Sequence, residues 1–95
     1  MPETDDWLVE ELEIVNERGL HARAAARLVT VANQFEADLT VSRDEHTVPA
    51  HSIMGLLLLV AGLGSSITIA AKGRDAPEAL AALGALVRNR FDEAK

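Results

Sequence analysis

Two residues that are suited to phosphoryl chemistry, His21 and Arg23, stand where the sequence changes from a strand-like to a helical pattern. A turn-forming run at 16–19 precedes them, and an alanine-rich helical pattern follows. The first turn of a helix leaves backbone N–H groups without intrahelical partners and carries the positive end of the helix dipole, so this place attracts an anion. A neutral imidazole is a nucleophile, and a guanidinium adds a positive charge with several donors.

A nucleophile at an anion site predicts a histidine that carries a phosphoryl group. The structural alternative is a histidine that caps the helix or faces solvent without any chemistry. His46 and His51 have no further metal-ligating residues nearby, so we interpret both as surface residues and expect no metal site. The chain also has no Gly-x-x-x-x-Gly-Lys run of the kind that holds a nucleotide.

Four short segments have the alternation of apolar and polar residues that is typical of half-buried strands. They lie at about residues 8–15, 39–42, 47–48 and 66–71. In the first segment, Leu8, Leu12 and Ile14 take even positions, and we expect the glutamates to face water. Pro49 ends the third segment or marks it as an edge strand.

Three further segments have apolar residues at helical spacing. They run from about 22 to 34, from Ser52 to a glycine at 62 or 64, and from 76 to 91. Serine is a preferred capping residue, and Asp75 and Glu78 have the spacing of a capping box. The order βαββαβα favours an antiparallel sheet with helices on one face, a fold of the α+β class.

Length and composition limit the class of protein. The 95 residues suit one domain, predicted at 7–95 after a flexible acidic tail at 1–6. A net charge of −6 disfavours nucleic acid and anionic membranes, and the lack of cysteine excludes disulfides and thiol chemistry. The apolar run 53–63 is too short to span a bilayer, and the acidic N-terminus does not have the layout of a signal peptide. We therefore expect a cytoplasmic protein with no membrane insertion.

Three pieces of sequence carry a resemblance to a known family. They are Gly19-Leu20-His21-Ala22-Arg23, Ser52-Ile53-Met54-Gly55 and Ile67-Thr68-Ile69-Ala70-Ala71-Lys72-Gly73. In this order, over about residues 8 to 91, the chain resembles HPr, the histidine-containing phosphocarrier of the bacterial phosphotransferase system. The resemblance implies an open-faced β-sandwich with a four-stranded antiparallel sheet and three helices on one face.

The resemblance also implies roles for the residues of the first piece. His21 would receive a phosphoryl group from enzyme I and pass it to an enzyme II A-type acceptor, with Arg23 stabilising charge on the transferred group. Such a protein is a phosphoryl-transfer carrier rather than a free-standing enzyme, and it needs no cofactor. We expect a monomer.

One residue departs from the family's pattern, because Ala24 follows the arginine where the family usually has proline. Proline suits the first helical turn because it brings no N–H group to satisfy. Alanine at this position resembles the HPr relatives of nitrogen-type systems, which regulate rather than import sugar. Sugar uptake and nitrogen or carbon regulation both remain open, and the sequence favours regulation.

Ser52 has two interpretations. As a single serine before a helix, it is a plain N-cap. The run Ser-Ile-Met-Gly also resembles the regulatory site that an ATP-dependent HPr kinase phosphorylates in HPr proteins. A phosphate there lies at a helix N-terminus, so the fold should tolerate it, while it adds about two negative charges to the surface that receives partners.

The segment 53–60 is apolar almost all round, more than a short helix over a thin core needs. Ile53, Met54 and Leu57 are either buried in the ordinary way or exposed as a docking patch near His21. Arg27, one turn beyond Arg23, either pairs with acidic residues of a partner or is solvated.

A rival interpretation belongs to another class of protein. A non-catalytic interaction module, or a small-molecule sensor of ferredoxin-like topology, shares most of this element order. Such a domain needs no nucleophile, so an acid-labile, base-stable phosphate on histidine would separate the two interpretations.

Overall fold

The computed structural model describes residues 7–95, and the predicted acidic tail at 1–6 lies outside the described residues. The elements are β1 (Leu8–Glu13), α1 (Ala22–Ala32), β2 (Asp38–Arg43), β3 (His46–Pro49), α2 (Ile53–Leu58), β4 (Ser66–Lys72) and α3 (Ala76–Arg88), followed by a 3-10 turn at Arg90–Asp92. The predicted order βαββαβα is therefore confirmed.

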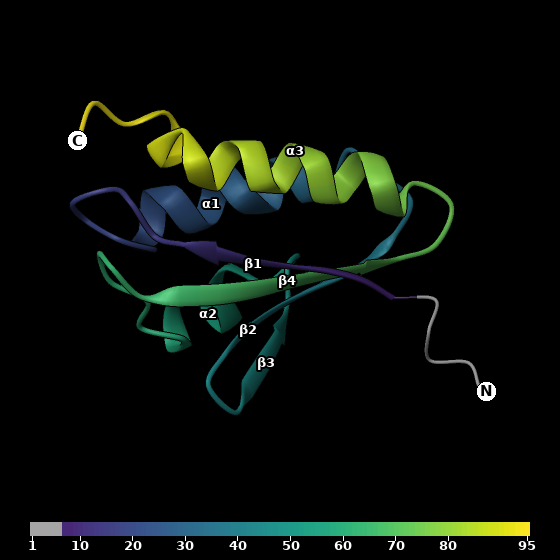
Figure 1. Cartoon of the computed structure of the whole chain (residues 1–95), viewed down its shortest axis with the longest axis horizontal. Helices are drawn as coiled ribbons and strands as arrows, with labels where there is room; N and C mark the ends of the chain where they lie inside the picture. Colours follow the sequence, from purple (N-terminus) through teal and green to yellow (C-terminus); the bar gives the residue numbers. More distant parts are fainter. Residues whose placement is uncertain (1–6) are drawn as a thin grey trace.

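The four strands form one antiparallel sheet in the order β1-β4-β2-β3 (Figure 1). Strand β4 lies between β1 and β2, so that Ile67 pairs with Leu12 and Ile69 pairs with Val41. Along β4 every second residue is buried and the residues between are partly exposed. One face of the sheet is thus buried and the other is open, as expected for an open-faced sandwich.

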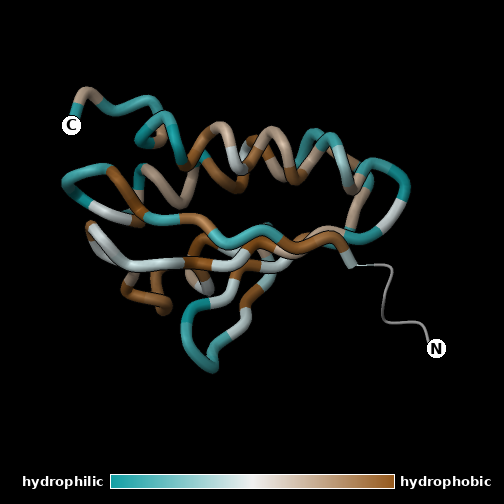
Figure 2. The backbone as a smooth tube through the Cα atoms, viewed as in Figure 1, coloured by the Kyte–Doolittle hydropathy of each residue, from teal (hydrophilic) through white to brown (hydrophobic). Residues whose placement is uncertain are grey.

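The three helices cover the buried face. Helix α3 contacts β1 and β4, α1 contacts α3, and α2 lies against α1 and β3. Figure 1 shows α1 and α3 side by side along the sheet, and Figure 2 shows the hydrophilic segments concentrated in the connecting turns. The fully buried Leu28 of α1, Leu56 of α2 and Leu83 of α3 join the strand residues in one core.

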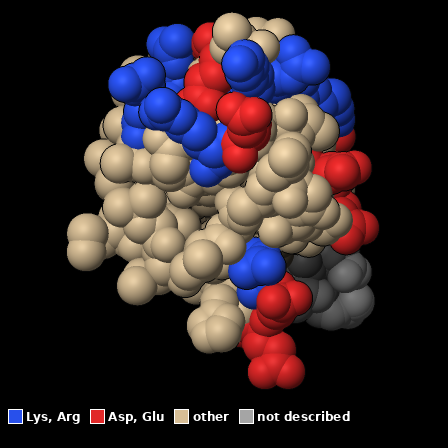
Figure 3. All heavy atoms as spheres, turned by 90° about the vertical axis from the view of Figure 1, so that its left-hand side faces the viewer, with Lys and Arg blue, Asp and Glu red and all other residues tan. Residues whose placement is uncertain are grey.

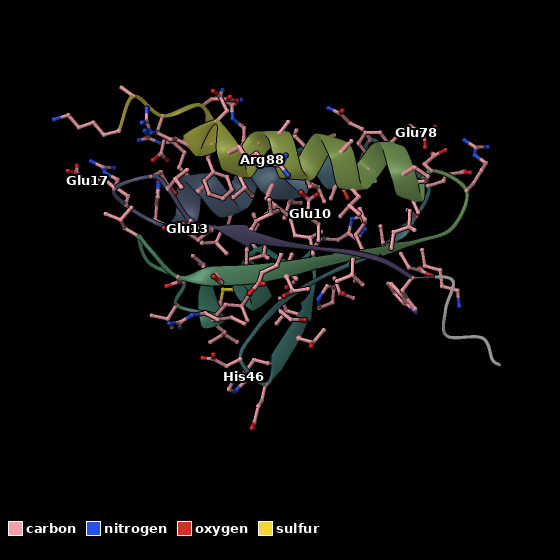
Figure 4. The ribbon with its side chains drawn as sticks, viewed as in Figure 1. Glu10, Glu13, Glu17, His46, Glu78 and Arg88 are labelled. Atoms are coloured by element: carbon pink, nitrogen blue, oxygen red, sulfur yellow. The ribbon has the colours of Figure 1, made fainter. Side chains whose placement is uncertain are left out.

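Glu10 corrects the expectation that the glutamates of the first strand all face water. It takes an even position of β1, in phase with Leu12, and therefore lies on the helix side of the sheet. There its carboxylate pairs with the guanidinium of Arg88 on α3 (Figure 4). A Cβ at Gly84 of α3 would come within 3.1 Å of both side chains, so the glycine leaves room for this pair.

The expected capping box at the start of α3 is also wrong. The Asp75 side chain makes no capping hydrogen bond. Its Oδ2 instead accepts from the backbone N–H of Glu36 at 2.8 Å, and its Oδ1 accepts from Nε of Arg74 at 3.2 Å. These bonds, the one from Glu36 first, hold the pKa of Asp75 below its usual value. Asp75 thus ties the end of the α1–β2 connection to the start of α3.

All three helices end earlier than predicted. Helix α2 ends at Leu58 because Val60 adopts a φ of +50°, where a right-handed helix cannot continue. The guanidinium of Arg43 satisfies the carbonyl groups left at this end, donating from Nη1 to Leu59 O at 3.0 Å and to Val60 O at 3.1 Å.

The end of α3 has a direct consequence for the C-terminal residues. Arg90, Phe91 and Asp92 all have φ between +53° and +65°, so a left-handed turn follows α3. Phe91 is only 3% exposed and packs into the core at this point. The residues that follow continue beyond the end of α3 (Figure 1), where Glu93 contacts His21 and Lys95 O accepts from the backbone N–H of Glu17.

Gly19 sets the turn before α1. Its φ is +69°, and an added Cβ would lie 2.6 Å from Ala61 O and 2.8 Å from the Cα of Gly62. Close approach at this point allows the backbone N–H of Leu20 to donate to Ala61 O at 2.8 Å. The turn is therefore packed against the segment that follows α2, and it fixes where α1 begins.

We expect Gly19→Ala to destabilise the protein by about 1–3 kcal/mol, because it combines a left-handed backbone with a backbone clash. Gly62→Ala is the matched control, since a Cβ there meets nothing within 4 Å. Urea unfolding of both variants measures the difference. Equal stability of the two variants would contradict this account of the turn.

Candidate functional site

His21 is the N-cap of α1, in an extended conformation with φ −83° and ψ −177°. Its ring Nδ1 accepts from the backbone N–H of Arg23 at 3.3 Å, and its carbonyl oxygen accepts from Ala25 N at 2.8 Å. The histidine that the sequence placed at the mouth of a helix is therefore directed, through Nδ1, at the donors of the first turn. The side chain is 23% exposed, and the contact of Nδ1 with the Arg23 N–H lies at the surface.

The second ring nitrogen has a different partner. Nε2 lies 2.5 Å from Oε2 of Glu93, a residue of the C-terminal segment. The other oxygen, Oε1, accepts from Nδ2 of Asn16 at 3.0 Å, and Nδ2 also donates to Gly19 O at 2.8 Å. These hydrogen bonds connect the turn before α1, the histidine and the end of the chain.

The charge on Glu93 determines where the imidazole proton lies. Burial tends to raise the pKa of Glu93, but the hydrogen bonds from His21 and Asn16 and the positive charges of His21 and Arg18 outweigh it, and the pKa is below its usual value. The carboxylate is therefore ionised at neutral pH and acts only as an acceptor. A neutral imidazole must then carry its proton on Nε2, and its lone pair is on Nδ1.

The C-terminal segment is held across the site at more than one point. Asp92 pairs with Arg27 of α1, with 3.1 Å between Oδ2 and Nη2. At the end of the segment, Lys95 O accepts from the backbone N–H of Glu17 at 2.6 Å. Glu93 lies between these two contacts, so its carboxylate is fixed from both sides.

A hollow lies between α1 and the C-terminal segment. Basic and acidic side chains line it together: Arg18, Arg23, Arg27 and Lys95 with Glu17, Asp92 and Glu93. Figure 3 shows this end of the molecule, with blue and red side chains intermixed at the top and a wide area without charged groups below. Within residues 7–95, no ion pair holds the Arg23 guanidinium, whereas Arg27 is paired with Asp92.

Ser52 is the N-cap of α2, and its Oγ accepts from the backbone N–H of Gly55 at 2.9 Å. The capping interpretation is thus confirmed. Ile53 and Met54 are 40% and 69% exposed, and Leu57 is partly buried. Leu57 also lines a shallow hollow together with His21, so the predicted patch and the histidine adjoin.

Sequence reasoning did not find every exposed apolar residue of this surface, nor the partners of the histidine. Three further side chains are more than 60% exposed: Leu58, Val60 and Leu63. Glu93 and Asn16 were missed because 72 residues separate Glu93 from His21, and no local pattern relates them. The fully buried position of Asn16, a polar residue, is visible only in the structure.

The other histidines lie apart from this site. His46 and His51 are both exposed, and Nδ1 of His51 lies 2.6 Å from Oδ1 of Asn33. Among residues 7–95, no three side chains of the metal-binding types gather in one place. No helix of the described part combines the length and apolarity needed to cross a membrane.

The chain matches known proteins along most of its length. The family model described as "PTS HPr component phosphorylation site" matches residues 8–89. Phosphocarrier protein NPr of Shewanella violacea is 46% identical over 87 residues, which cover 92% of this chain and 96% of that relative. Phosphocarrier protein HPr of Cupriavidus necator is 45% identical over 86 residues, 90% of this chain and 97% of the relative.

Solved structures agree with these matches. Phosphocarrier protein HPr from Bacillus anthracis superposes with a TM-score of 0.82 at 46% identity, covering 85% of this chain and 96% of that one. HPr-C-His from Thermoanaerobacter tengcongensis superposes with a TM-score of 0.88 at 38% identity, covering 93% and 99%. The chain therefore belongs to the HPr family, the phosphocarrier proteins of the phosphotransferase system.

Proposed function

We propose that this phosphocarrier accepts its phosphoryl group on Nδ1 of His21 and donates it from the same atom. The proposal rests on the observation that each of the two ring nitrogens of His21 has its own contact. Nδ1 faces the first-turn donor at 3.3 Å and has the lone pair, while Nε2 is bound to Glu93 at 2.5 Å. A nucleophile and an anion site thus coincide at one atom.

The transfer step can be written with all its bonds. The Nδ1 lone pair attacks phosphorus, the Nδ1–P bond forms, and the bond from phosphorus to the donor atom breaks with its electron pair leaving on the donor. The proton on Nε2 stays in place, because Nδ1 has none to lose. The N–H groups of the first turn and the Arg23 guanidinium oppose the negative charge of the phosphoryl oxygens.

The partners we propose are enzyme I as donor and an enzyme II A-type protein as acceptor. The exposed side chains of Ile53 and Met54, with the partly buried Leu57, support a docking surface beside His21. Arg27 is less well supported as a residue of this surface, because it is paired with Asp92 and a partner's carboxylate would have to replace Asp92. We propose that the carrier acts as a monomer in the cytoplasm and, from Ala24, in the regulatory branch.

We further propose that Ser52 is phosphorylated by an ATP-dependent HPr-type kinase. The side chain is only partly buried, and it stands at the start of α2 next to the exposed Ile53. A phosphate on Oγ would bring negative charge to the proposed docking surface. Repulsion from an acidic partner would then hinder phosphorylation of His21.

His21→Ala is expected to abolish phosphorylation by enzyme I and phosphoenolpyruvate. The wild type should gain one phosphate that is lost in mild acid, as measured by intact-protein mass spectrometry. His46→Ala and His51→Ala serve as controls and should both keep the phosphate, since these exposed side chains lie outside the site. An acid-labile phosphate on His21→Ala would refute the assignment.

Arg23→Ala is expected to leave the fold intact and to slow phosphoryl transfer roughly 10²–10³-fold, the usual effect of removing one transition-state donor. The exposed position of Arg23 means that its loss opens no cavity. Rapid-quench kinetics measures transfer, and circular dichroism measures folding. Arg74→Ala removes another exposed arginine, on the far connection before α3, and should transfer at the wild-type rate. An unchanged rate in Arg23→Ala would reduce this residue to a surface charge.

Ser52→Asp is expected to keep the helix cap and to lower the association rate with enzyme I. The loss should diminish at high salt, because screening weakens the repulsion. Ala81→Glu is the charge-matched control: it adds one negative charge at an exposed position of α3, the helix that lies over β1 and β4. If Ser52→Asp and this control associate with enzyme I at the same rate at low salt, the proposed regulatory role of Ser52 is wrong.

A further inference from the structure

We propose that Glu93 is a positioning residue for transfer at His21, an inference that rests on the proposed function. Its carboxylate holds the ring proton on Nε2 and so keeps the lone pair on Nδ1. It also balances the positive charge that the ring acquires when phosphorus is attached. Glu93 acts through the imidazole and does not itself contact the phosphoryl group.

The geometry separates the two edges of the ring. The 2.5 Å contact to Oε2 engages Nε2, and the 3.3 Å contact to the Arg23 backbone N–H engages Nδ1. The two nitrogens lie on different edges of the imidazole, so Glu93 leaves the approach to Nδ1 free. A carboxylate in this place orients the base without competing with the anion that the base attacks.

Glu93 is itself held rigidly enough to orient a ring. Its side chain is only 16% exposed, and Asn16, which is fully buried, donates to its second oxygen at 3.0 Å. Because Nδ2 of Asn16 meets two acceptors, Glu93 Oε1 and Gly19 O, it must be the amide nitrogen that faces them. The neighbouring residues Phe91 and Asp92 anchor the segment in the core and on Arg27.

The charge balance of the transfer gives the carboxylate its effect. Before transfer the ring is neutral, with one proton on Nε2. After the Nδ1–P bond forms and the donor bond breaks, both ring nitrogens are substituted and the ring is positively charged. The adjacent Glu93 carboxylate stabilises this cation while Nε2 keeps its proton. A cationic ring is also the better leaving group when the acceptor attacks phosphorus, so Glu93 assists both uptake and delivery.

A purely structural role for Glu93 predicts different behaviour. In that case the carboxylate would only fasten the C-terminal segment, and its removal would loosen that segment without changing the tautomer of the ring. Nitrogen-15 NMR of the imidazole distinguishes the two roles, because the shifts of Nδ1 and Nε2 report which atom carries the proton.

The test compares Glu93→Ala and Glu93→Gln with two controls. Glu78→Gln removes the same charge in the first turn of α3, at the opposite end of the molecule (Figure 4). Asp92→Asn removes the neighbouring carboxylate, which contacts Arg27 and not the imidazole. Ring NMR is recorded on the unphosphorylated proteins at a pH where the imidazole is neutral, and single-turnover transfer is measured with enzyme I.

We expect the wild type to show the Nε2-protonated tautomer alone, with an imidazole N–H signal protected from exchange. Glu93→Ala should show a mixture of tautomers, lose that signal and slow transfer roughly 10–100-fold, the usual effect of losing an orienting partner. Glu93→Gln should keep the tautomer, because an amide oxygen also accepts from Nε2–H, yet transfer more slowly than the wild type because the charge is gone. Glu78→Gln should match the wild type in both measurements, and Asp92→Asn should keep the wild-type ring signals.

Two results would overturn the inference. The first is a wild-type tautomer together with a wild-type rate in Glu93→Ala. The second is that Glu93→Ala and Asp92→Asn both transfer slowly while their ring signals stay unchanged. The C-terminal segment would then have a structural role only. Failure of the proposed function looks different, because an acid-labile phosphate would then appear on His21→Ala. The ring NMR needs no phosphorylation, so it reports the contact between His21 and Glu93 whether or not His21 accepts the phosphoryl group.

Discussion

The imidazole of His21 is held by two different parts of the chain, and most of the other features of this end of the molecule serve to bring those parts together. On one side the first turn of α1 donates to Nδ1, and on the other Glu93 contacts Nε2. The turn at Gly19 fixes where α1 begins, and the C-terminal residues after the left-handed turn at Arg90–Asp92 contact this region. Since an imidazole can engage only one partner per nitrogen, the two contacts together define its tautomer.

The charges around this histidine are balanced rather than simply positive. The protein has a net charge of −6, yet Arg18, Arg23 and Arg27 line the hollow beside α1. Two carboxylates of the C-terminal segment stand among them, and one of these already occupies Arg27. Of the three arginines, Arg23 is the one on the first turn of α1, where positive charge acts on the same place as the helix dipole. For this reason we propose Arg23, and not Arg27, as the arginine that contacts the phosphoryl group.

The periodicity of apolar residues was enough to predict the element order, the antiparallel sheet and the position of His21 at the start of a helix, and the residue type of Ser52 predicted its role as a cap. These features depend on neighbouring residues, which a single sequence displays directly. The inward position of Glu10 could also have been predicted, because Glu10 and Leu12 both take even positions of the strand. It was missed because a charged side chain was expected to face water. Its partner, Arg88, could be found only once α3 was placed over β1.

The contacts that the sequence did not reveal are those between distant residues and those that depend on unusual backbone. Glu93 reaches His21 after a turn in which three consecutive residues other than glycine adopt positive φ, while Asn89, the asparagine that precedes them, keeps a negative φ. Val60, which also has a positive φ without being glycine, ends α2. The Asp75 side chain accepts from the backbone N–H of Glu36 and makes no capping hydrogen bond to its own helix. Tertiary packing, for example the burial of Phe91, determines these conformations, so local propensity does not predict them.

In the transfer proposed for this protein, the phosphoryl group is carried on Nδ1 of His21. Phosphorus-31 and nitrogen-15 NMR of the phosphorylated, isotope-labelled protein tests it most directly, because a one-bond coupling identifies the nitrogen attached to phosphorus. We expect coupling to Nδ1, with the proton still on Nε2 beside Glu93. Coupling to Nε2, or a phosphate attached to any other residue, would contradict it.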